Sequence, residues 1–314
     1  MITCAAGIDV GKNFFDVGMA PAGPNFRVPN VPKGVAIIID RLRRLKVQRV
    51  VLEAIGPYGA ALIAGLRSHG FDVGVVNPRR IKAFRDAEGR RAKTDRLDAG
   101  LIARFALTMT DVVRPLPSAD QLALKALATR RRQLVEIIAM EKTRLKQTSE
   151  PLILASHRAA IAALTIERCA IEREIEQRIA QDAVLTRRKE ILTSIPGIGQ
   201  QVATVLLTEL PELGSIDRRA IASLAGLAPH PNQSGISHGR AQIAGGRPCV
   251  RTALYMAGLA SCRANPQARQ SYRAMREAGK PAKVAIIAAA RKLVILANAL
   301  IKSDRSFDPN HTTA

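Results

Sequence analysis

The sequence predicts two kinds of structure in one chain, an α/β domain at the N-terminus and a mostly helical remainder. Short apolar runs typical of strands alternate with helical periodicity over the first hundred residues. After Pro117 the strand signals stop and long helical patterns begin. The length of 314 residues suggests about two domains and allows a sizeable core.

The N-terminal part contains signals for five strands and two helices. Strands are expected at 4–10, 14–20, 26–31, 48–53 and 71–77, and helices at 35–45 and 58–69. The first two strands form a hairpin across Gly11-Lys12-Asn13. Because later strands are separated by helices, this order predicts a mixed sheet.

Two long helices should follow, the first capped by Ser118. Their patterns cover 122–148 and 152–183 and meet near Pro151, which predicts an antiparallel hairpin or coiled-coil arm. Such an arm suits oligomerisation or RNA binding, and a solvated bundle is the alternative. We expect domains at 1–116, 117–187 (assembly region) and 188–302, with a loose tail at 303–314.

The C-terminal part is predicted to be compact and mostly helical. Helices are expected after residue 199, within 214–228, at 250–262 and at 282–301. The segment 229–248 is rich in Gly, Ser and Arg and is expected to be a loop.

Charge is the main clue from composition, because 48 basic and 26 acidic residues leave a net charge of +22. Basic residues run through most of the chain, so a nucleic acid is the first candidate partner. The four cysteines form no C-x-x-C pair, which argues against a disulfide framework or a zinc ribbon. Aromatic residues make up only 3%, which argues against a single-strand binder built on stacking rings.

The same composition predicts a cytoplasmic protein. Free thiols and the lack of a signal-peptide pattern favour a reducing compartment. No stretch of about 18 apolar residues without charge is present, so a membrane span is not expected.

Four carboxylates form the first candidate site. Asp9 lies in a buried strand, Glu53 ends another, and Asp95 and Asp98 occur three residues apart in K-T-D-R-L-D-A. On a helix, that spacing places both aspartates on one face. Four such carboxylates suit two Mg²⁺ ions for phosphodiester chemistry. A surface position is the alternative for Asp98.

Ile195-Pro196-Gly197-Ile198-Gly199 precedes an amphipathic helix and is typical of a helix-hairpin-helix. Gly197 and Gly199 permit a tight turn that exposes backbone N–H groups to a phosphate. A purely structural turn is the alternative.

A third motif is Ser234-Gly235, which precedes Arg240, Arg247 and Arg251. A serine in a flexible loop can attack a phosphate, and nearby arginines can stabilise the transition state. On spacing alone, a simple turn is the more common explanation. Tyr255 is a weaker candidate nucleophile, because it lies in an apolar helix.

These motifs together resemble a known family. G-I-D-V-G-K, V-L-E-A-I-G-P-Y-G, V-V-N-P-R-R, G-R-R-A-K-T-D-R-L-D-A, I-P-G-I-G, L-A-G-L-A-P, Q-S-G, G-G-R-P-C-V-R-T-A-L-Y-M and A-G-K-P-A-K-V-A occur in order over almost the whole chain. The ordered set resembles the transposases of the insertion-sequence one-ten family, which include bridge-RNA-guided recombinases and Piv-type DNA invertases.

The resemblance implies a RuvC-like, RNase H-type N-terminal domain with a DEDD site formed by Asp9, Glu53, Asp95 and Asp98. It implies a nucleophilic serine at Ser234 and Mg²⁺ as the cofactor. Donor and target DNA, a structured guide RNA and other copies of the chain, as dimers and tetramers, would be the partners. The resemblance also implies a bacterial protein that is associated with the nucleoid when it acts. The acidic domain of one subunit would meet the serine domain of another.

Other functions remain open at this point. A junction-resolving RuvC-like nuclease would need the acidic set but not Ser234. A non-catalytic nucleic-acid-binding protein would need neither, and a tyrosine recombinase would need Tyr255. The chain contains no G-x-x-x-x-G-K-[ST] motif, as expected if a covalent phosphoserine conserves the bond energy.

Overall fold

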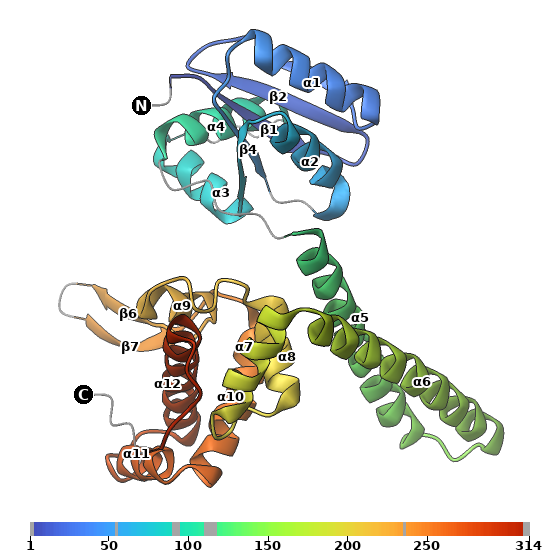
Figure 1. Ribbon diagram of the computed structural model, residues 1–314, viewed down its shortest axis with the longest axis vertical. Helices are drawn as coiled ribbons and strands as arrows, with labels where there is room; N and C mark the ends of the chain where they lie inside the picture. The colour runs from blue at the N-terminus through green and yellow to red at the C-terminus, as the bar shows by residue number, and fades with distance from the viewer. Residues whose placement is uncertain (1–2, 54–55, 90–94, 110–117, 235–236, 310–314) are drawn as a thin grey trace. The chain divides into compact units, whose positions relative to one another are not determined.

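A computed structural model describes residues 3–53, 56–89, 95–109, 118–234 and 237–309, without the side chains of 56–57, 95–97, 231–234 and 237–240. The chain forms two compact units, residues 1–116 and 117–314. The helices from residue 118 onward therefore share a unit with the C-terminal helices (Figure 1).

The N-terminal unit is built on a five-stranded mixed sheet. The strands are β1 (Ala5–Val10), β2 (Phe14–Ala20), β3 (Phe26–Pro29), β4 (Arg49–Glu53) and β5 (Asp72–Val76), in the order β3-β2-β1-β4-β5. β1, β2 and β3 pair antiparallel, whereas β1, β4 and β5 pair parallel. This is the mixed sheet that the sequence predicts, and it fits a RuvC-like α/β domain.

Helices cover both faces of the sheet (Figure 1). They are α1 (Pro32–Arg44), α2 (Ala60–Ser68) after a 3₁₀ turn at Gly56–Gly59, α3 (Pro78–Ala87) and α4 (Asp95–Thr108). Ala6, Ile8 and Val10 of β1 pack with α1 and α2 in one core cluster. Ala5 belongs to the opposite cluster with α4, as the two-residue alternation of a strand requires.

The contact between α4 and the sheet is unusually close because two glycines face the helix. Gly7 and Gly18 are paired across β1 and β2. A Cβ at Gly7 would lie 2.1 Å from the Ala103 nitrogen, and one at Gly18 would lie 2.5 Å from the Ala99 carbonyl carbon. At the other end of α4, Arg49 donates to the carbonyl of Met109 at 3.0 Å. The glycines and Arg49 together fix α4 on the sheet.

The second unit contains ten elements. They are α5 (Ala119–Leu145), α6 (Pro151–Gln181), α7 (Ala183–Ser194), α8 (Gln200–Glu209), α9 (Arg218–Leu224), β6 (Pro229–Ser234), β7 (Ser237–Ile243), α10 (Pro248–Ala264), α11 (Pro266–Glu277) and α12 (Ala282–Ser303). Its core contains residues from α5 to α10 and from α12, most of them Leu, Ile, Val and Ala.

The predicted helical hairpin is present as α5 and α6. Ser118 begins α5 with a capping box, accepting from the Gln121 N–H at 3.2 Å. Arg130 pairs with Glu167, and Glu141 pairs with His157, so the helices run antiparallel (Figure 1). Supercoiling of this hairpin as a coiled coil stays a prediction.

Two elements correct the sequence expectations. The segment 229–248, predicted as a loop, contains the antiparallel pair β6 and β7, with an irregularity between His230 and Asn232. The residues of both strands are mostly polar, so no apolar alternation marks them. Helix α11 was also missed, because none of its residues is fully buried and its sequence is mostly polar.

Helix α12 is long and apolar enough to cross a membrane by length and composition alone. It packs instead among α7, α9, α10 and α11, with Ala285, Ala290, Val294 and Ala297 buried. This is the core helix that the sequence predicts for residues 282–301. All four cysteines lie within the described residues and are free thiols.

Candidate active site

Asp9 and Glu53 lie at the ends of two neighbouring parallel strands. The β1–β4 register pairs Gly7 with Val51 and Ile8 with Leu52, so Asp9 and Glu53 follow side by side. Each is two residues beyond a position that faces α4, Gly7 in β1 and Val51 in β4. Because side chains alternate along a strand, both carboxylates belong to the α4 face of the sheet.

Helix α4 brings Asp98, and the backbone of Asp95, to the same side of the sheet. Asp98 immediately precedes Ala99, whose carbonyl oxygen would lie 2.5 Å from a Cβ at Gly7. Asp95 begins the helix nearly one turn earlier, and its side chain lies outside the described residues. The helix predicted for K-T-D-R-L-D-A is therefore present from Asp95 onward, and it places Asp98 against the sheet.

Asp98 is held by a basic residue of the neighbouring helix. The Arg85 guanidinium of α3 lies 3.5 Å from an Asp98 carboxylate oxygen, and both side chains are at least four-fifths buried. On the same pair of helices, Arg104 forms a two-pronged ion pair with Glu88, at 3.1 and 2.9 Å. Arg85 therefore supplies positive charge where two carboxylates of one helix turn would repel each other.

A fifth carboxylate, Asp16, lies on this face and was missed by the sequence analysis. The β1–β2 register pairs Asp16 with Asp9. Arg27 of β3 donates to both Asp16 oxygens, at 2.9 and 2.8 Å. The signal was available in the hairpin, because Asp16 is two residues from Gly18 just as Asp9 is two residues from Gly7.

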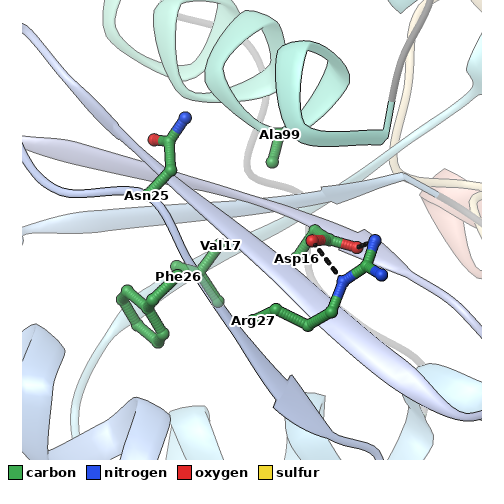
Figure 2. Close-up of a pocket in the computed structure, with 6 residues that line it drawn as sticks. All are labelled: Asp16, Val17, Asn25, Phe26, Arg27 and Ala99. Atoms are coloured by element: carbon green, nitrogen blue, oxygen red, sulfur yellow. Dashed lines mark hydrogen bonds and ion pairs between the residues drawn. The ribbon is translucent and has the colours of Figure 1, made fainter.

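A pocket opens beside Asp16 (Figure 2). It has a volume of about 360 Å³ and is lined by Asp16, Val17, Asn25, Phe26, Arg27 and Ala99. Ala99 of α4 lies across the pocket from the Asp16–Arg27 pair (Figure 2). The face that carries the carboxylates is thus open to a ligand next to the N-terminal part of α4.

The described carboxylates do not form a finished metal centre. Within the described part of the chain, no three His, Cys, Asp or Glu side chains converge closely enough to hold a metal ion. Carboxylates are nevertheless the ligands that Mg²⁺ prefers, and Asp9, Glu53 and the start of α4 share one face. The donor set fits a divalent cation, which would compete with Arg85 for Asp98.

Ser234 lies in the second unit, at the tip of a hairpin. It is the last residue of β6 and pairs with Ser237, the first residue of β7. Arg240 lies further along β7. The side chains of Ser234 and Arg240 are outside the described residues, so the structure gives their backbone positions only.

Arg247 and Arg251, predicted as nucleic-acid contacts, make internal bonds. Arg247 donates through two nitrogens to the Glu212 carboxylate, both at 2.6 Å, and to the Glu209 carbonyl at 2.8 Å. The hydrogen bond to Glu212 raises the pKa of Arg247 above its usual range. Arg251 donates to the Gly245 carbonyl at 3.0 Å. Arg247 therefore anchors the start of α10 to the segment after α8.

Gly197 and Gly199 have different environments in the turn between α7 and α8. Gly197 has a φ of +102°, and a Cβ there would lie 2.7 Å from the Ser261 Cβ and 2.8 Å from the Ala257 carbonyl oxygen. Gly199 begins α8 at an exposed position with no atom near its absent Cβ. Gly197 thus permits close packing on α10, and only Gly199 is open to solvent.

Three of the four cysteines are poor candidates for an alternative nucleophile. Burial raises the pKa of the thiols of Cys4, Cys249 and Cys262 above the ordinary value, so little thiolate is present at neutral pH.

Two family models match most of the chain. A transposase model of the DEDD type covers residues 6–149, and a second, described as Transposase IS116/IS110/IS902 family, covers residues 189–273. The pilin gene-inverting protein of Moraxella bovis is 30% identical, with 96% of this chain and 97% of that protein aligned. The IS110 uncharacterized 43.6 kDa protein of Streptomyces coelicolor is 24% identical over 96% and 95% of the two chains.

Similar solved structures include RuvC of Thermus thermophilus. A chain of its complex with a Holliday junction substrate is 17% identical, with a TM-score of 0.29, over 35% of this chain and 98% of that one. A second RuvC structure gives 20% identity and a TM-score of 0.25, over 36% and 84%.

Proposed function

Because this chain belongs to the IS116/IS110/IS902 family of transposases, we propose that it recombines DNA through a phosphoserine intermediate on Ser234. The chain is a DNA transposase or recombinase, and the proposal concerns how it breaks and rejoins the strands. The observation that supports the acidic part of the proposal is that Asp9, Glu53 and the start of α4 share one face of the sheet, and the family resemblance supports Ser234 as the nucleophile.

The acidic face would position the scissile phosphate. Asp9, Glu53, Asp95 and Asp98 would hold one or two divalent cations, most simply Mg²⁺, which would neutralise charge that develops on the phosphate oxygens. Arg85 would hold the carboxylate of Asp98 in place until the substrate complex forms. Gly7 and Gly18 would set the distance between α4 and the sheet, and therefore the positions of Asp95 and Asp98.

Ser234 would be the nucleophile. Its Oγ would attack phosphorus, so that the Oγ–P bond forms and the bond from phosphorus to the 3′ oxygen breaks. The proton lost from Oγ would be balanced by the proton gained on the released 3′-hydroxyl. In the second step the 3′-hydroxyl of the partner strand would attack the phosphoserine and return the proton to Ser234. A hairpin tip suits this role because it can enter the groove of a DNA duplex.

The resemblance also suggests how sites are chosen. A structured guide RNA would pair with donor and target DNA, and this protein would bind the backbones through its +22 charge. Assembly as a dimer or tetramer, with α5 and α6 as an assembly element, would join the acidic unit of one subunit to Ser234 of another. Exposed Leu152 and Ile166 on α6 support a partner-facing surface there.

The experiment that tests this proposal looks for the covalent intermediate. The chain is co-expressed with its native flanking DNA and a candidate target, isolated under denaturing conditions and digested. Mass spectrometry should detect a nucleotide on the Ser234 peptide, absent in Asp9→Ala and Ser234→Ala but present in Ser237→Ala. Cleaved DNA with no adduct, and with Ser234→Ala fully active, would instead support a hydrolytic nuclease.

A further inference from the structure

A strongly basic segment near the C-terminus is used neither by the acidic face nor by Ser234. Residues 263–292 contain eight Lys or Arg and one acidic residue, Glu277. All of these residues are described, and five basic side chains form a continuous exposed group around α11. We define the α11 basic surface as Arg263, Arg269, Arg273, Arg276 and Lys280.

Three of these arginines form one stripe on the helix. Arg269, Arg273 and Arg276 are spaced by four and three residues, so they lie on the same side of α11. The half-buried Tyr272 and Met275 lie on an adjacent side, where α11 packs on α10 and α12. At 1.5 Å per residue the stripe is about 10 Å long.

The two ends of the stripe are tied to the remaining members. The Arg269 guanidinium donates to the carbonyl oxygen of Arg263, and the Arg276 guanidinium donates to that of Lys280 at 2.6 Å. These bonds hold the two guanidinium groups close to other basic residues. Like charges at this spacing repel, so the arrangement favours an anion on its outer side.

No carboxylate compensates this charge. Between residues 263 and 292, all within the described chain, no Lys or Arg is part of an ion pair, and Glu277 is not a partner to any of them. Arginines of the helical hairpin are different, because Arg130 pairs with Glu167 and Arg131 with Glu172. The arginines of the helical hairpin therefore stabilise the fold through ion pairs, whereas those of the α11 basic surface are available to a partner.

The motif A-G-K-P-A-K shapes the end of this surface. Gly279, with a φ of +76°, ends α11, and the Lys280 N–H donates back to the Met275 carbonyl at 3.0 Å. This bond closes the helix in the manner of a Schellman turn. Pro281 is the N-cap residue of α12, and it prevents α11 from continuing. The turn therefore holds Lys280 at the end of the arginine stripe.

We propose that the α11 basic surface binds the sugar–phosphate backbone of duplex DNA without reading its sequence. The inference rests on the proposed function, since it takes DNA as the substrate of this chain. A stripe of about 10 Å spans about three phosphates of one strand, which rise 3.4 Å each along the axis. Guanidinium groups match phosphate oxygens in geometry, and backbone contacts fix the register of a protein on DNA.

The test measures how affinity for a 30-base-pair duplex depends on salt, with the full-length protein and without divalent cations. Removing three phosphate contacts, in the triple variant Arg269→Ala, Arg273→Ala, Arg276→Ala, should make the slope of log K against log salt shallower by about 2–3. Affinity should fall at least tenfold at low salt. Circular dichroism checks folding, and the corresponding triple Gln variant should give the same shift if α11 is sensitive to alanine.

The matched control removes the same number of charges from compensated positions. Arg130→Ala, Arg131→Ala, Arg178→Ala should leave the slope within about 0.5 of the wild type, because each of these arginines is held by a glutamate. Equal slopes for all three proteins would overturn the proposal. So would a triple α11 variant that keeps its DNA slope but loses its slope on a structured RNA of equal length.

The outcome does not depend on catalysis. The duplex assay contains no divalent cation, so it measures binding without strand cleavage. A shifted slope together with no adduct on Ser234 would therefore contradict the phosphoserine chemistry and leave the α11 basic surface as a DNA contact.

Discussion

Substitution of Gly7 by alanine tests the role of the close contact between β1 and α4. The new Cβ would lie 2.1 Å from the Ala103 nitrogen, 2.5 Å from the Ala99 oxygen and 2.6 Å from the Ile102 carbonyl carbon. All three are backbone atoms, so no side chain can move aside. Restoring ordinary contacts of about 3.5 Å requires α4 to retreat by about 1.4 Å.

The expected effect is both structural and functional. Overpacking of this kind costs about 1–3 kcal/mol, and we expect faster hydrogen exchange in peptides from residues 95–109. Asp98 immediately precedes Ala99, so it would move with the helix. A misplacement of about 1 Å at a catalytic group lowers the rate of DNA cleavage about 100-fold.

Gly100 on the same helix supplies the control. A Cβ at Gly100 meets only the Arg104 and Asn25 side chains, at 3.8 and 3.9 Å, which are ordinary contacts. Gly100→Ala should stabilise α4 by about 0.5–1 kcal/mol and leave cleavage near the wild-type rate. The reasoning is refuted if Gly7→Ala exchanges and cleaves like the wild type, or if Gly100→Ala is equally damaging.

Three further predictions follow from the ion pairs and caps. Arg247→Ala should lower the free energy of unfolding by about 1–3 kcal/mol in urea titrations, with unchanged DNA affinity of the folded protein, because Arg247 anchors Glu212; a loss of affinity without a loss of stability would contradict this. Arg85→Gln should lower the Mg²⁺ concentration for half-maximal cleavage, because Asp98 would no longer be held by a competing cation; a higher requirement would contradict it. Backbone N–H groups of α9 hold the pKa of Asp217 below its ordinary value of 3.8. The Asp217 cap therefore stabilises the folded protein above pH 3.8, and this stabilisation is lost as the pH falls through the lower pKa of the folded state. Urea titrations from pH 7 to pH 2 should show that Asp217→Ala has a lower free energy of unfolding than the wild type at pH 7 and the same value at the acid end. A difference that stays constant with pH would contradict a role for the Asp217 carboxylate charge.

The sequence predicts the parts of the fold that bury apolar surface. Strands β1, β2, β4 and β5 were found because their apolar runs are buried on both faces of the sheet. Helix α11 and the pair β6–β7 were missed because they bury little and carry mostly polar residues. Backbone hydrogen bonds and contacts with neighbouring helices hold these elements, and such contacts cannot be predicted from the sequence alone.

The candidate site divides in a similar way. Asp9 and Glu53 were identified because a carboxylate at the end of a buried strand is costly without a function. Asp16 was not identified, because its place beside Asp9 depends on the register of the hairpin. Arg247 resembled a phosphate ligand in sequence, but its bonds to Glu212 and Glu209 depend on contacts between segments 35 or more residues apart.

The most direct test of the account compares DNA cleavage by Asp9→Asn and by Asp40→Asn. Asp9→Asn keeps the size of the side chain and removes one charge from the acidic face. Asp40 is an exposed residue of α1, paired with Arg44 on a helix that covers the opposite face of the sheet. We predict that Asp9→Asn slows strand cleavage by at least about 100-fold in saturating Mg²⁺ while Asp40→Asn cleaves at the wild-type rate. Wild-type cleavage by Asp9→Asn would contradict the assignment of the α4 face as the catalytic site.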